Sequence, residues 1–400
     1  MNCLKKIYCR TYQFGFRIAM PFLPYRVPVQ MDGLDEIPSL FKEKGIESVL
    51  LVIDANVRKL GLTADFEVLL EKTGIKFSVY EQANPNPTIE NIENARSIYL
   101  DGNAQAIVAI GGGSAMDCAK VTGARVVCPQ KRVQKMKGVM KILKKTPLLI
   151  AVPTTAGTGS EVTLAAVITD GETHHKYPIN DFNLIPDYAV LDPSLTLGLP
   201  ASVTSTTGLD ALTHAVEAYI GGSTTKFTRN MSIEAVTLIK ESLETAVEAG
   251  SDVEARRKML RAAYCAGASF TRSYVGYVHG VAHSLGGAYG IAHGLANAVI
   301  LPVFLRIYGR SCEKKLADLA VKSGVAPAGI STADAAERFI AWIEGMNKKF
   351  NLPAGFEQIK EEDIKIMAEN ADKESNPLYP VPLLMDAKEL ESVYRKLIIK

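Results

Sequence analysis

Between Ile46 and Leu191, short apolar runs alternate with stretches of helical composition, of which Asn91–Leu100 is one. This alternation predicts a parallel sheet covered by helices on both faces, because a helical crossover brings the chain back to the same end of the sheet. Five runs have the length and composition of buried strands that end in a loop: Ser48–Ile53, Phe77–Tyr80, Ala106–Ile110, Leu148–Val152 and Tyr188–Leu191.

The pattern changes after Pro200, where helical stretches follow one another without a convincing strand between them. A chain of 400 residues usually divides into two or three domains, each with its own core. We therefore expect an α/β domain over residues 1–199, of which 1–26 form an N-terminal extension, and an all-helical domain over residues 200–400. The clearest helical stretches of the second domain are Arg229–Ala249, Glu254–Ala268, Asp334–Phe350 and Ala387–Ile399.

Composition and charge narrow the range of functions. Apolar residues make up 47% and charged residues 22%, as in ordinary globular enzymes. A net charge of +2 gives no overall attraction to nucleic acid or membrane, and no apolar stretch approaches the roughly 18 residues that span a bilayer. The basic run Lys131–Lys145 contains no aromatic residue, so we interpret it as a solvated lysine-rich helix rather than a nucleic-acid platform.

The cysteines and the N-terminal extension bear on location and assembly. The six cysteines show no paired spacing and follow no export signal, which favours reduced thiols in a cytoplasmic protein. Residues 1–26 carry five basic and no acidic residues, but they lack the serine content of a transit peptide and contain Pro21 and Pro24. We interpret them as an extension that packs on the body at a subunit contact, and we expect a homodimer or a higher homo-oligomer.

A glycine-rich turn follows the predicted strand Ala106–Ile110. Three glycines, Gly111 to Gly113, would let the backbone approach a phosphate closely, and Ser114 would cap the helix that follows. Asp117, three residues later, would complete a pair of the capping-box type. The free amides at such a helix start favour a pyrophosphate, although the run differs from the usual Gly-x-Gly-x-x-Gly fingerprint.

Two further strand ends support a nucleotide site. Strand Leu148–Val152 leads into Pro153–Thr163, a glycine-containing loop rich in hydroxyl groups, and loops at the carboxyl ends of parallel strands are where ligands bind in open α/β sheets. Strand Ser48–Ile53 ends at Asp54, which either accepts hydrogen bonds from an adenosine ribose or serves as a turn residue. A carboxylate there would repel a 2′-phosphate, which favours NAD over NADP.

Four of the six histidines lie in two short stretches rich in glycine and alanine. In the first stretch, Asp210 and His214 are four residues apart in a helical sequence, so their side chains share one face. The second stretch contains His279, His283 and His293. A carboxylate and imidazoles from two segments can surround a divalent transition metal at about 2 Å. The spacing does not choose among the three histidines of the second stretch.

Together and in this order, these segments resemble the iron-containing (group III) alcohol dehydrogenases. The resemblance covers most of the chain from about residue 30 onward. It implies a Rossmann-like, nucleotide-binding α/β domain followed by a helical domain, with the metal held in the cleft between them. The matching segments are Asn84–Thr88, Gly111–Lys120, Pro153–Thr163, Leu184–Leu195, Thr207–Tyr219 and Val278–Ala298.

Residue by residue, the resemblance implies a set of metal ligands and a set of cofactor contacts. It makes His283 a non-ligand near the nicotinamide and the substrate, and it places Phe270 against the substrate; these two are the candidate catalytic residues. The implied metal ligands are Asp210, His214, His279 and His293. The candidate cofactor-binding residues are Asp54, Asn86, Gly112, Gly113, Ser114, Asp117, Thr154, Thr155, Thr158, Thr163 and Lys176.

The implied reaction is reversible hydride transfer between a small alcohol or diol and its aldehyde or ketone. We expect Fe(II), with Zn(II) as the alternative, and NAD as the cofactor. The metal would lower the pKa of a bound alcohol, and His283 would relay the proton to solvent. Glu217, three residues after His214, is either a partner of the metal ligands or a surface glutamate.

Three rival functions remain open from the sequence: a glycerol or other polyol dehydrogenase, a dehydroquinate synthase-like lyase, and a metal-containing scaffold without activity. The complete four-ligand pattern with Asp210 and the Pro153–Thr163 loop argue against the two enzymes, and an intact ligand set with an open position argues against the scaffold. Many family members carry Asn-Pro-Arg near the C-terminus, where this chain has Asn376–Pro382, and the N-terminal extension is longer than in several relatives. Both departures concern the substrate more than the chemistry.

Overall fold

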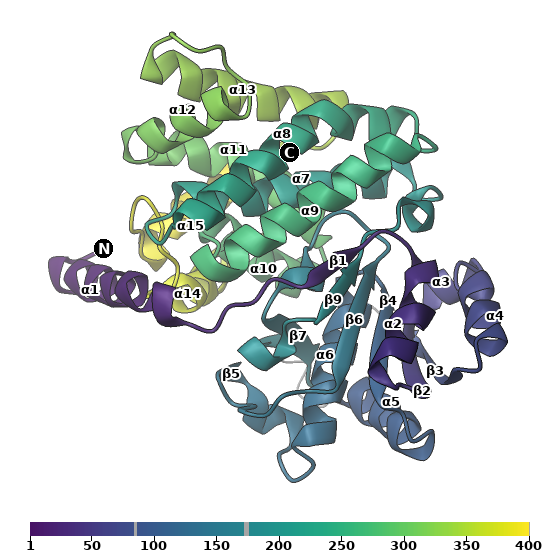
Figure 1. Ribbon diagram of the computed structural model, residues 1–400. Helices are drawn as coiled ribbons and strands as arrows, with labels where there is room; N and C mark the ends of the chain where they lie inside the picture. The colour runs from purple at the N-terminus through teal and green to yellow at the C-terminus, as the bar shows by residue number, and fades with distance from the viewer. Residues whose placement is uncertain (84–85, 172–175, 400) are drawn as a thin grey trace. The chain divides into compact units, whose positions relative to one another are not determined.

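The computed structural model describes residues 1–83, 86–171 and 176–399, and of Lys176 it describes the backbone only. The chain divides into two compact units, coloured by residue number in Figure 1. Residues 1–23 belong with the helical unit, although their place in the sequence had grouped them with the α/β domain. The α/β unit comprises Pro24–Leu199 and Ser251–Leu260, and the helical unit comprises Met1–Leu23, Pro200–Gly250 and Arg261–Lys400.

A six-stranded sheet in which neighbouring strands run parallel forms the centre of the α/β unit, which confirms the predicted fold class. All five predicted strands are present. The sixth, β1, is a three-residue strand at one edge, too short to stand out in the sequence. In spatial order the strands are β1 (Val29–Met31), β9 (Tyr188–Val190), β6 (Leu148–Pro153), β4 (Ala106–Gly111), β2 (Ser48–Asp54) and β3 (Lys76–Ala83).

The central strands are apolar on both faces because both faces are covered. Along β2, Leu50 and Val52 point into one core cluster, whereas Val49, Leu51 and Ile53 point into the other. Successive side chains of a strand alternate between faces, so a continuous apolar run is what a doubly covered strand requires. The first cluster is closed by α5 (Ile89–Asp101) and α6 (Gly113–Val127), and the second by α2 (Ile37–Lys44) and α4 (Ala64–Lys72).

The basic run Lys131–Lys145 is not the helix that its composition predicted. It forms a short 3-10 helix, Val133–Met136, followed by the two-residue strand β5 (Gly138–Val139). Met140 and Leu143 both have a φ of 53°, which a right-handed helix does not allow. β5 belongs to a small second sheet with β8 (Lys176–Asn180) and β7 (Ala165–Thr169).

The helical unit is built around α7, whose residues Gly208 to Ile220 are all buried. α7 packs against α8 and α11, and α10 packs against α11 and α14. Polar residues of α7 therefore lie inside the unit. Its helices are α1 (Cys3–Ala19), α7 (Ala201–Ile220), α8 (Lys226–Glu248), α10 (Tyr277–Tyr289), α11 (His293–Tyr308), α12 (Glu313–Lys322), α13 (Thr332–Lys349), α14 (Glu361–Ser375) and α15 (Ala387–Lys396), while α9 (Val253–Ser273) begins in the other unit.

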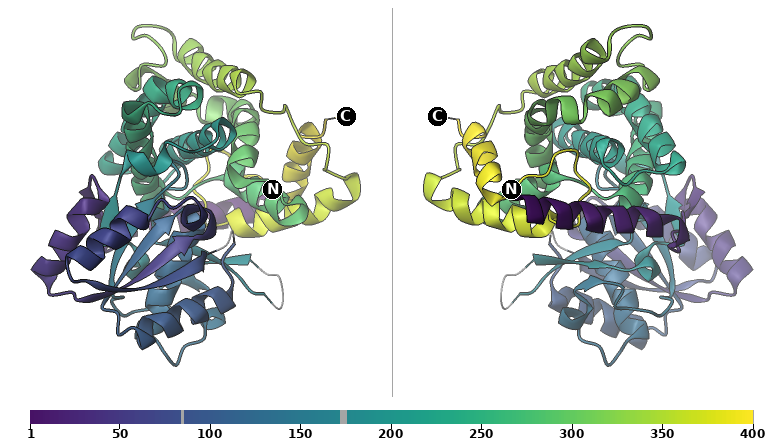
Figure 2. Two further views of the ribbon diagram at one scale, coloured as in Figure 1. Left: turned by 90° about the vertical axis from the view of Figure 1, so that its right-hand side faces the viewer. Right: turned by 90° about the vertical axis from the view of Figure 1, so that its left-hand side faces the viewer.

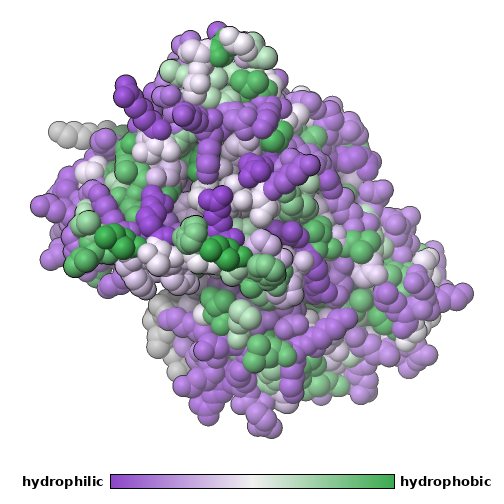
Figure 3. Space-filling model, turned by 60° about the vertical axis from the view of Figure 1, so that its left-hand side comes forward, coloured by the Kyte–Doolittle hydropathy of each residue, from purple (hydrophilic) through white to green (hydrophobic). Residues whose placement is uncertain are grey.

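The N-terminal helix α1 is fastened to the C-terminal part of the helical unit and lies beside α14 (Figure 2). Lys5 pairs with Asp372 of α14 at 2.6 Å, and Gln13 donates to the backbone oxygen of Tyr379 at 2.7 Å. Apolar surface gathers along the stretch that α1 occupies (Figure 3). Among the residues described, no helix combines the length and the apolar character needed to cross a membrane.

Candidate metal and nucleotide sites

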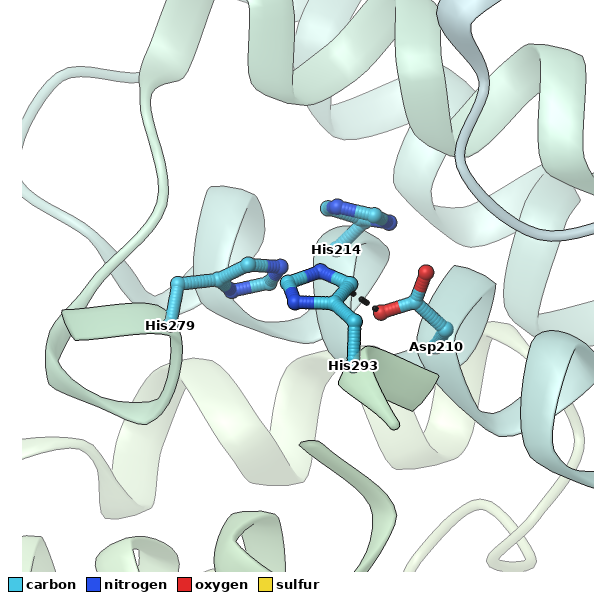
Figure 4. A group of neighbouring side chains, drawn as sticks. All are labelled: Asp210, His214, His279 and His293. Carbon is cyan, nitrogen blue, oxygen red and sulfur yellow. Dashed lines mark ion pairs between the residues drawn. The ribbon is translucent and has the colours of Figure 1, made fainter. Parts of the chain in front are cut away.

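Three helices of the helical unit bring one carboxylate and three imidazoles together (Figure 4). Asp210 and His214 lie one turn apart on α7, His279 lies in the first turn of α10, and His293 is the first residue of α11. One ligand atom from each side chain lies within 4.8 Å of the others. These are the four residues that the family resemblance implied as metal ligands.

Asn297, one turn after His293 on α11, points its amide into the middle of this cluster. Its Nδ2 atom lies 2.6 Å from Oδ1 of Asp210, 3.1 Å from Nε2 of His293 and 3.2 Å from Nε2 of His279. The Asn297 amide thus contacts three of the four side chains of the cluster. Sequence reasoning missed Asn297, although its four-residue spacing from His293 was available as a signal.

The donor set fits a divalent transition metal, for which three imidazoles and a carboxylate are suitable ligands. Burial, and next the neighbouring His214, lower the pKa of His279 well below its usual value of 6.5. The imidazole is therefore held neutral, which is the form that binds a metal.

Glu217 is a buried residue that contacts His279 of the cluster, not a surface residue. It is 3% exposed, and its Oε2 atom lies 2.6 Å from Nδ1 of His279. Its Oε1 atom accepts the backbone N–H of Val278 at 2.9 Å. A Cβ atom at Gly276 would lie 2.5 Å from Oε1, so glycine leaves the room that this carboxylate occupies. Burial raises the pKa of Glu217 to about 7.

The two candidate catalytic residues lie beside the same cluster. Nδ1 of His283 lies 2.6 Å from Oε1 of Glu374, and the hydroxyl of Tyr379 donates to that oxygen at 2.8 Å. The Phe270 ring stacks on His214 with centroids 4.1 Å apart. Sequence reasoning missed Glu374 and Tyr379; Tyr379 lies in the Asn376–Pro382 segment, where this chain departs from the family pattern.

In the α/β unit, the glycine turn lies at the point where the strand order reverses. From β2 the chain continues outward to β3, and β4 then returns to the other side of β2. Gly111, at the end of β4, has a φ of 156°, and a Cβ there would lie 2.8 Å from both Asp54 and Ala115. Only glycine permits this approach. A reversal of strand order at carboxyl ends is the usual ligand crevice of an open α/β sheet.

Three loops meet at this turn. A Cβ on Gly113 would lie 3.1 Å from Oγ1 of Thr158, and one on Gly112 would lie 3.7 Å from Oγ1 of Thr155. The backbone N–H of Asn86 points to Oγ of Ser114 at 3.4 Å. The structure thus gathers most of the predicted cofactor residues around the start of α6.

The capping role predicted for Ser114 and Asp117 is wrong. α6 begins at Gly113, so Ser114 already lies inside the helix, and Gly112 is the cap without a side-chain bond. Asp117 instead accepts from Oγ of Ser160 at 3.0 Å and from the backbone N–H of Val167 at 2.9 Å. The three-residue spacing favoured a cap, but tertiary contacts with Ser160 of the Pro153–Thr163 loop and with Val167 determine where Asp117 points.

Lys120, which sequence reasoning did not single out, holds the Pro153–Thr163 loop in place. Its Nζ atom donates to the hydroxyls of Ser160 and Thr163 and to the backbone oxygen of Ala165, at 2.8–3.0 Å. Burial lowers the pKa of Lys120 to about 8. The Thr163 hydroxyl is thereby engaged in holding the loop.

Other predicted cofactor residues have structural contacts of their own. Oδ1 of Asp54 accepts the N–H groups of Asn56 and Val57 and caps the short helix α3 (Ala55–Lys59). Thr154 is 5% exposed, and its N–H donates to the backbone oxygen of Gly111 at 3.0 Å. The side chain of Lys176 lies outside the described residues.

A glycine turn at the switch point of a parallel sheet, followed in the chain by an aspartate–histidine cluster, defines the class of metal-dependent, nucleotide-linked oxidoreductases. Two family models match the chain: iron-containing alcohol dehydrogenase over residues 24–193, and the C-terminal part of the Fe-containing alcohol dehydrogenase family over residues 204–398. The chain belongs to the iron-containing alcohol dehydrogenase family.

Named relatives agree with this membership. The chain is 36% identical over 362 residues to the NAD-dependent methanol dehydrogenase of Bacillus methanolicus, covering 89% of this chain and 95% of the relative. It is also 36% identical to the 1,3-propanediol dehydrogenase of Klebsiella pneumoniae, over 88% and 92% of the two chains. The solved alcohol dehydrogenase of Oenococcus oeni superposes with a TM-score of 0.88 at 34% identity, over 93% of this chain and 100% of that one.

Proposed function

We propose that the chain is an iron- and NAD-dependent alcohol dehydrogenase that interconverts a small alcohol or diol with its aldehyde or ketone. The observation that carries this proposal is the convergence of Asp210, His214, His279 and His293 within 4.8 Å. We assign these four residues as the ligands of one Fe(II) ion, with Zn(II) as the alternative. When bound, the metal supplies a Lewis acid that lowers the pKa of an alcohol and polarises a carbonyl.

The residues around the ligands orient them and move a proton. Glu217 accepts from Nδ1 of His279 and so keeps the Nε2 atom of that ring toward the cluster. His283 is 42% exposed in its side chain and is hydrogen-bonded to Glu374, so it connects the cluster to solvent. We assign His283 as the group that relays the alcohol proton, with Glu374 and Tyr379 holding its ring.

On the nucleotide side, Gly112, Gly113 and the start of α6 bind the pyrophosphate through backbone amides. Ser114, Thr155 and Thr158 offer hydroxyl groups around the same turn. Asp54 disfavours a 2′-phosphate and so favours NAD over NADP. The nicotinamide supplies the acceptor for a hydride from the alcohol carbon.

Small alcohols and diols are the proposed substrates because the similar proteins include a methanol dehydrogenase and a 1,3-propanediol dehydrogenase. A polyol dehydrogenase remains the second candidate function, since the Asn376–Pro382 segment departs from the family pattern. We further propose a cytoplasmic homo-oligomer; that none of the six cysteines forms a disulfide supports the cytoplasmic location.

Ligand variants test this function directly. His279→Ala should lower bound iron and turnover by orders of magnitude, because it removes a ligand, whereas His283→Ala should keep the metal and slow the reaction. Iron content is measured by elemental analysis after anaerobic reconstitution, and NADH production is followed with methanol, ethanol and 1,3-propanediol. Full metal occupancy in His279→Ala would contradict the ligand assignment, and absence of NADH from all alcohols would contradict the reaction.

A further inference from the structure

α1 carries most of its large apolar side chains on the side that does not face the helical unit. The face turned to the helical unit is fastened by polar groups: Lys5 pairs with Asp372, and Arg10 donates to the backbone oxygens of Val381 and Pro382. Surface helices usually bury their apolar stripe and expose their charges. In α1, Cys9 and Phe16 face the body, where Phe16 packs edge-on against Tyr274 at 4.9 Å, but most of the large apolar side chains are exposed.

Six exposed residues lie in a row along the side of α1 that faces away from the helical unit, and the last of them lies in the short 3-10 helix Met20–Phe22 that follows. They recur at alternating spacings of four and three residues, the repeat that lines the contact between two packed helices. None of them is charged. The residues of this row, the α1 seam, are Leu4, Tyr8, Thr11, Gly15, Ile18 and Phe22.

The apolar area along the seam is large enough for a specific contact. The large side chains of the seam, Leu4, Tyr8, Ile18 and Phe22, are 56–85% exposed, and at about 200 Å² for a whole large side chain they present roughly 500 Å². With Ile7, Tyr12 and Phe14, which flank the seam and are 46–62% exposed, the whole apolar face reaches about 800 Å². That is the area each partner contributes to a standard protein interface, and it exceeds the largest apolar patch of most monomers.

Gly15 gives the centre of the seam a shape that suits a second helix. It lies mid-helix, where glycine is among the least favourable residues, and a Cβ at this position would meet no atom within 4 Å. The helical unit therefore does not require a glycine here. With Thr11 on one side and Ala19 on the other, it forms a shallow groove between the larger side chains, where another backbone can approach closely.

We propose that the α1 seam is a contact between two copies of this chain, with the seam of one copy packed against that of the other. This proposal does not depend on the catalytic activity. An anionic membrane fits less well, because the charges of Lys5 and Arg10 are already engaged with Asp372 and with backbone oxygens. The exposed Lys6 and Arg17 lie about 100° or more around the helix from every seam residue, so they do not flank the apolar row. The contact would lie outside the part of the chain that the family model matches, since that match begins at residue 24.

Two variants of the full chain distinguish a second copy of the chain from a membrane as the partner of the α1 seam. Ile18→Asp places a charge in the seam, and Gly15→Leu fills its central groove while raising both helix propensity and apolar character. Helix-to-helix packing predicts that both variants weaken self-association, whereas membrane binding would be weakened by the first and strengthened by the second. Ile366→Asp, on α14, is the matched control, because Ile366 is 60% exposed and lies outside the seam.

Sedimentation velocity over a range of concentrations measures association, with circular dichroism to confirm that each variant is folded. The expected result is a wild-type assembly whose dissociation constant rises at least about 100-fold in both seam variants and stays unchanged in the control. A monomeric wild type, or an assembly indifferent to both seam variants, would overturn the proposal. So would binding to phosphatidylglycerol vesicles that Gly15→Leu strengthens. If Ile18→Asp fails to fold, Gly15→Leu alone decides.

Discussion

Replacing Glu217 by Gln changes a residue that orients the proposed metal ligand His279 and leaves the ligand itself unchanged. The carboxylate has one oxygen for Nδ1 of His279, at 2.6 Å, and the other for the backbone N–H of Val278, at 2.9 Å. Glutamine has nearly the same shape but a single acceptor oxygen. Its NH2 group would face one of the two N–H donors, so either the ring or the backbone loses its bond.

The size of the effect follows from this buried geometry. An unpaired buried donor costs about 1–3 kcal/mol, and loss of a partner that orients a ligating histidine typically reduces metal affinity 10–100-fold. A tenfold change corresponds to about 1.4 kcal/mol, so the two estimates agree. We therefore expect the iron dissociation constant of Glu217→Gln to rise 10–100-fold, with the four ligands unchanged.

Metal affinity is measured by competition with a chelator under anaerobic conditions, and the thermal midpoint of the metal-free protein reports any structural damage. Glu374→Gln is the matched control, because Glu374 makes the same 2.6 Å contact with His283, which is not an assigned ligand. Gly276→Ala is a second route to the same result, since its Cβ would push Glu217 aside. Equal affinities in Glu217→Gln and wild type, or an equal loss in Glu374→Gln, would refute the reasoning.

Three further outcomes are expected. Asp54→Gly should narrow or reverse the preference for NAD, measured as the ratio of kcat/KM for the two cofactors, and a wild type that prefers NADP would contradict the role of Asp54. Burial holds the pKa of Lys120 at about 8, below the ~10.4 of an unfolded lysine, so the unfolded state binds more protons between these values and the Lys120 contribution to stability rises with pH there. Lys120→Met should remove that rise in thermal midpoint between pH 8 and 10, and parallel slopes would argue against it. Enzyme purified in air should lose activity because Fe(II) is oxidised, and it should regain activity with ferrous salt alone under anaerobic conditions. Recovery only with a thiol reductant would instead assign the loss to oxidation of the cysteines.

Much of the fold was predictable because local sequence patterns indicate its strands and helices. The continuous apolar runs at β2, β4 and β6 identify strands buried on both faces, since an exposed face would need polar residues at alternate positions. The edge strand β1 was not predictable, because three residues do not establish a period. The basic run Lys131–Lys145 misled for a related reason: composition favoured a helix, but positive φ angles at Met140 and Leu143 do not show in the composition.

For the candidate metal site, the sequence by itself determined that Asp210 and His214 share one face of a helix, because their spacing is that of one helical turn. Only the tertiary structure decided which residues stand around them. Glu217 and His279 are 62 positions apart, and a glutamate three residues after a histidine reads equally well as a surface residue. The same holds for Lys120 beneath Thr163 and for Asn297 between the imidazoles. Such contacts depend on how helices and loops pack against one another, and packing joins residues that no local period relates.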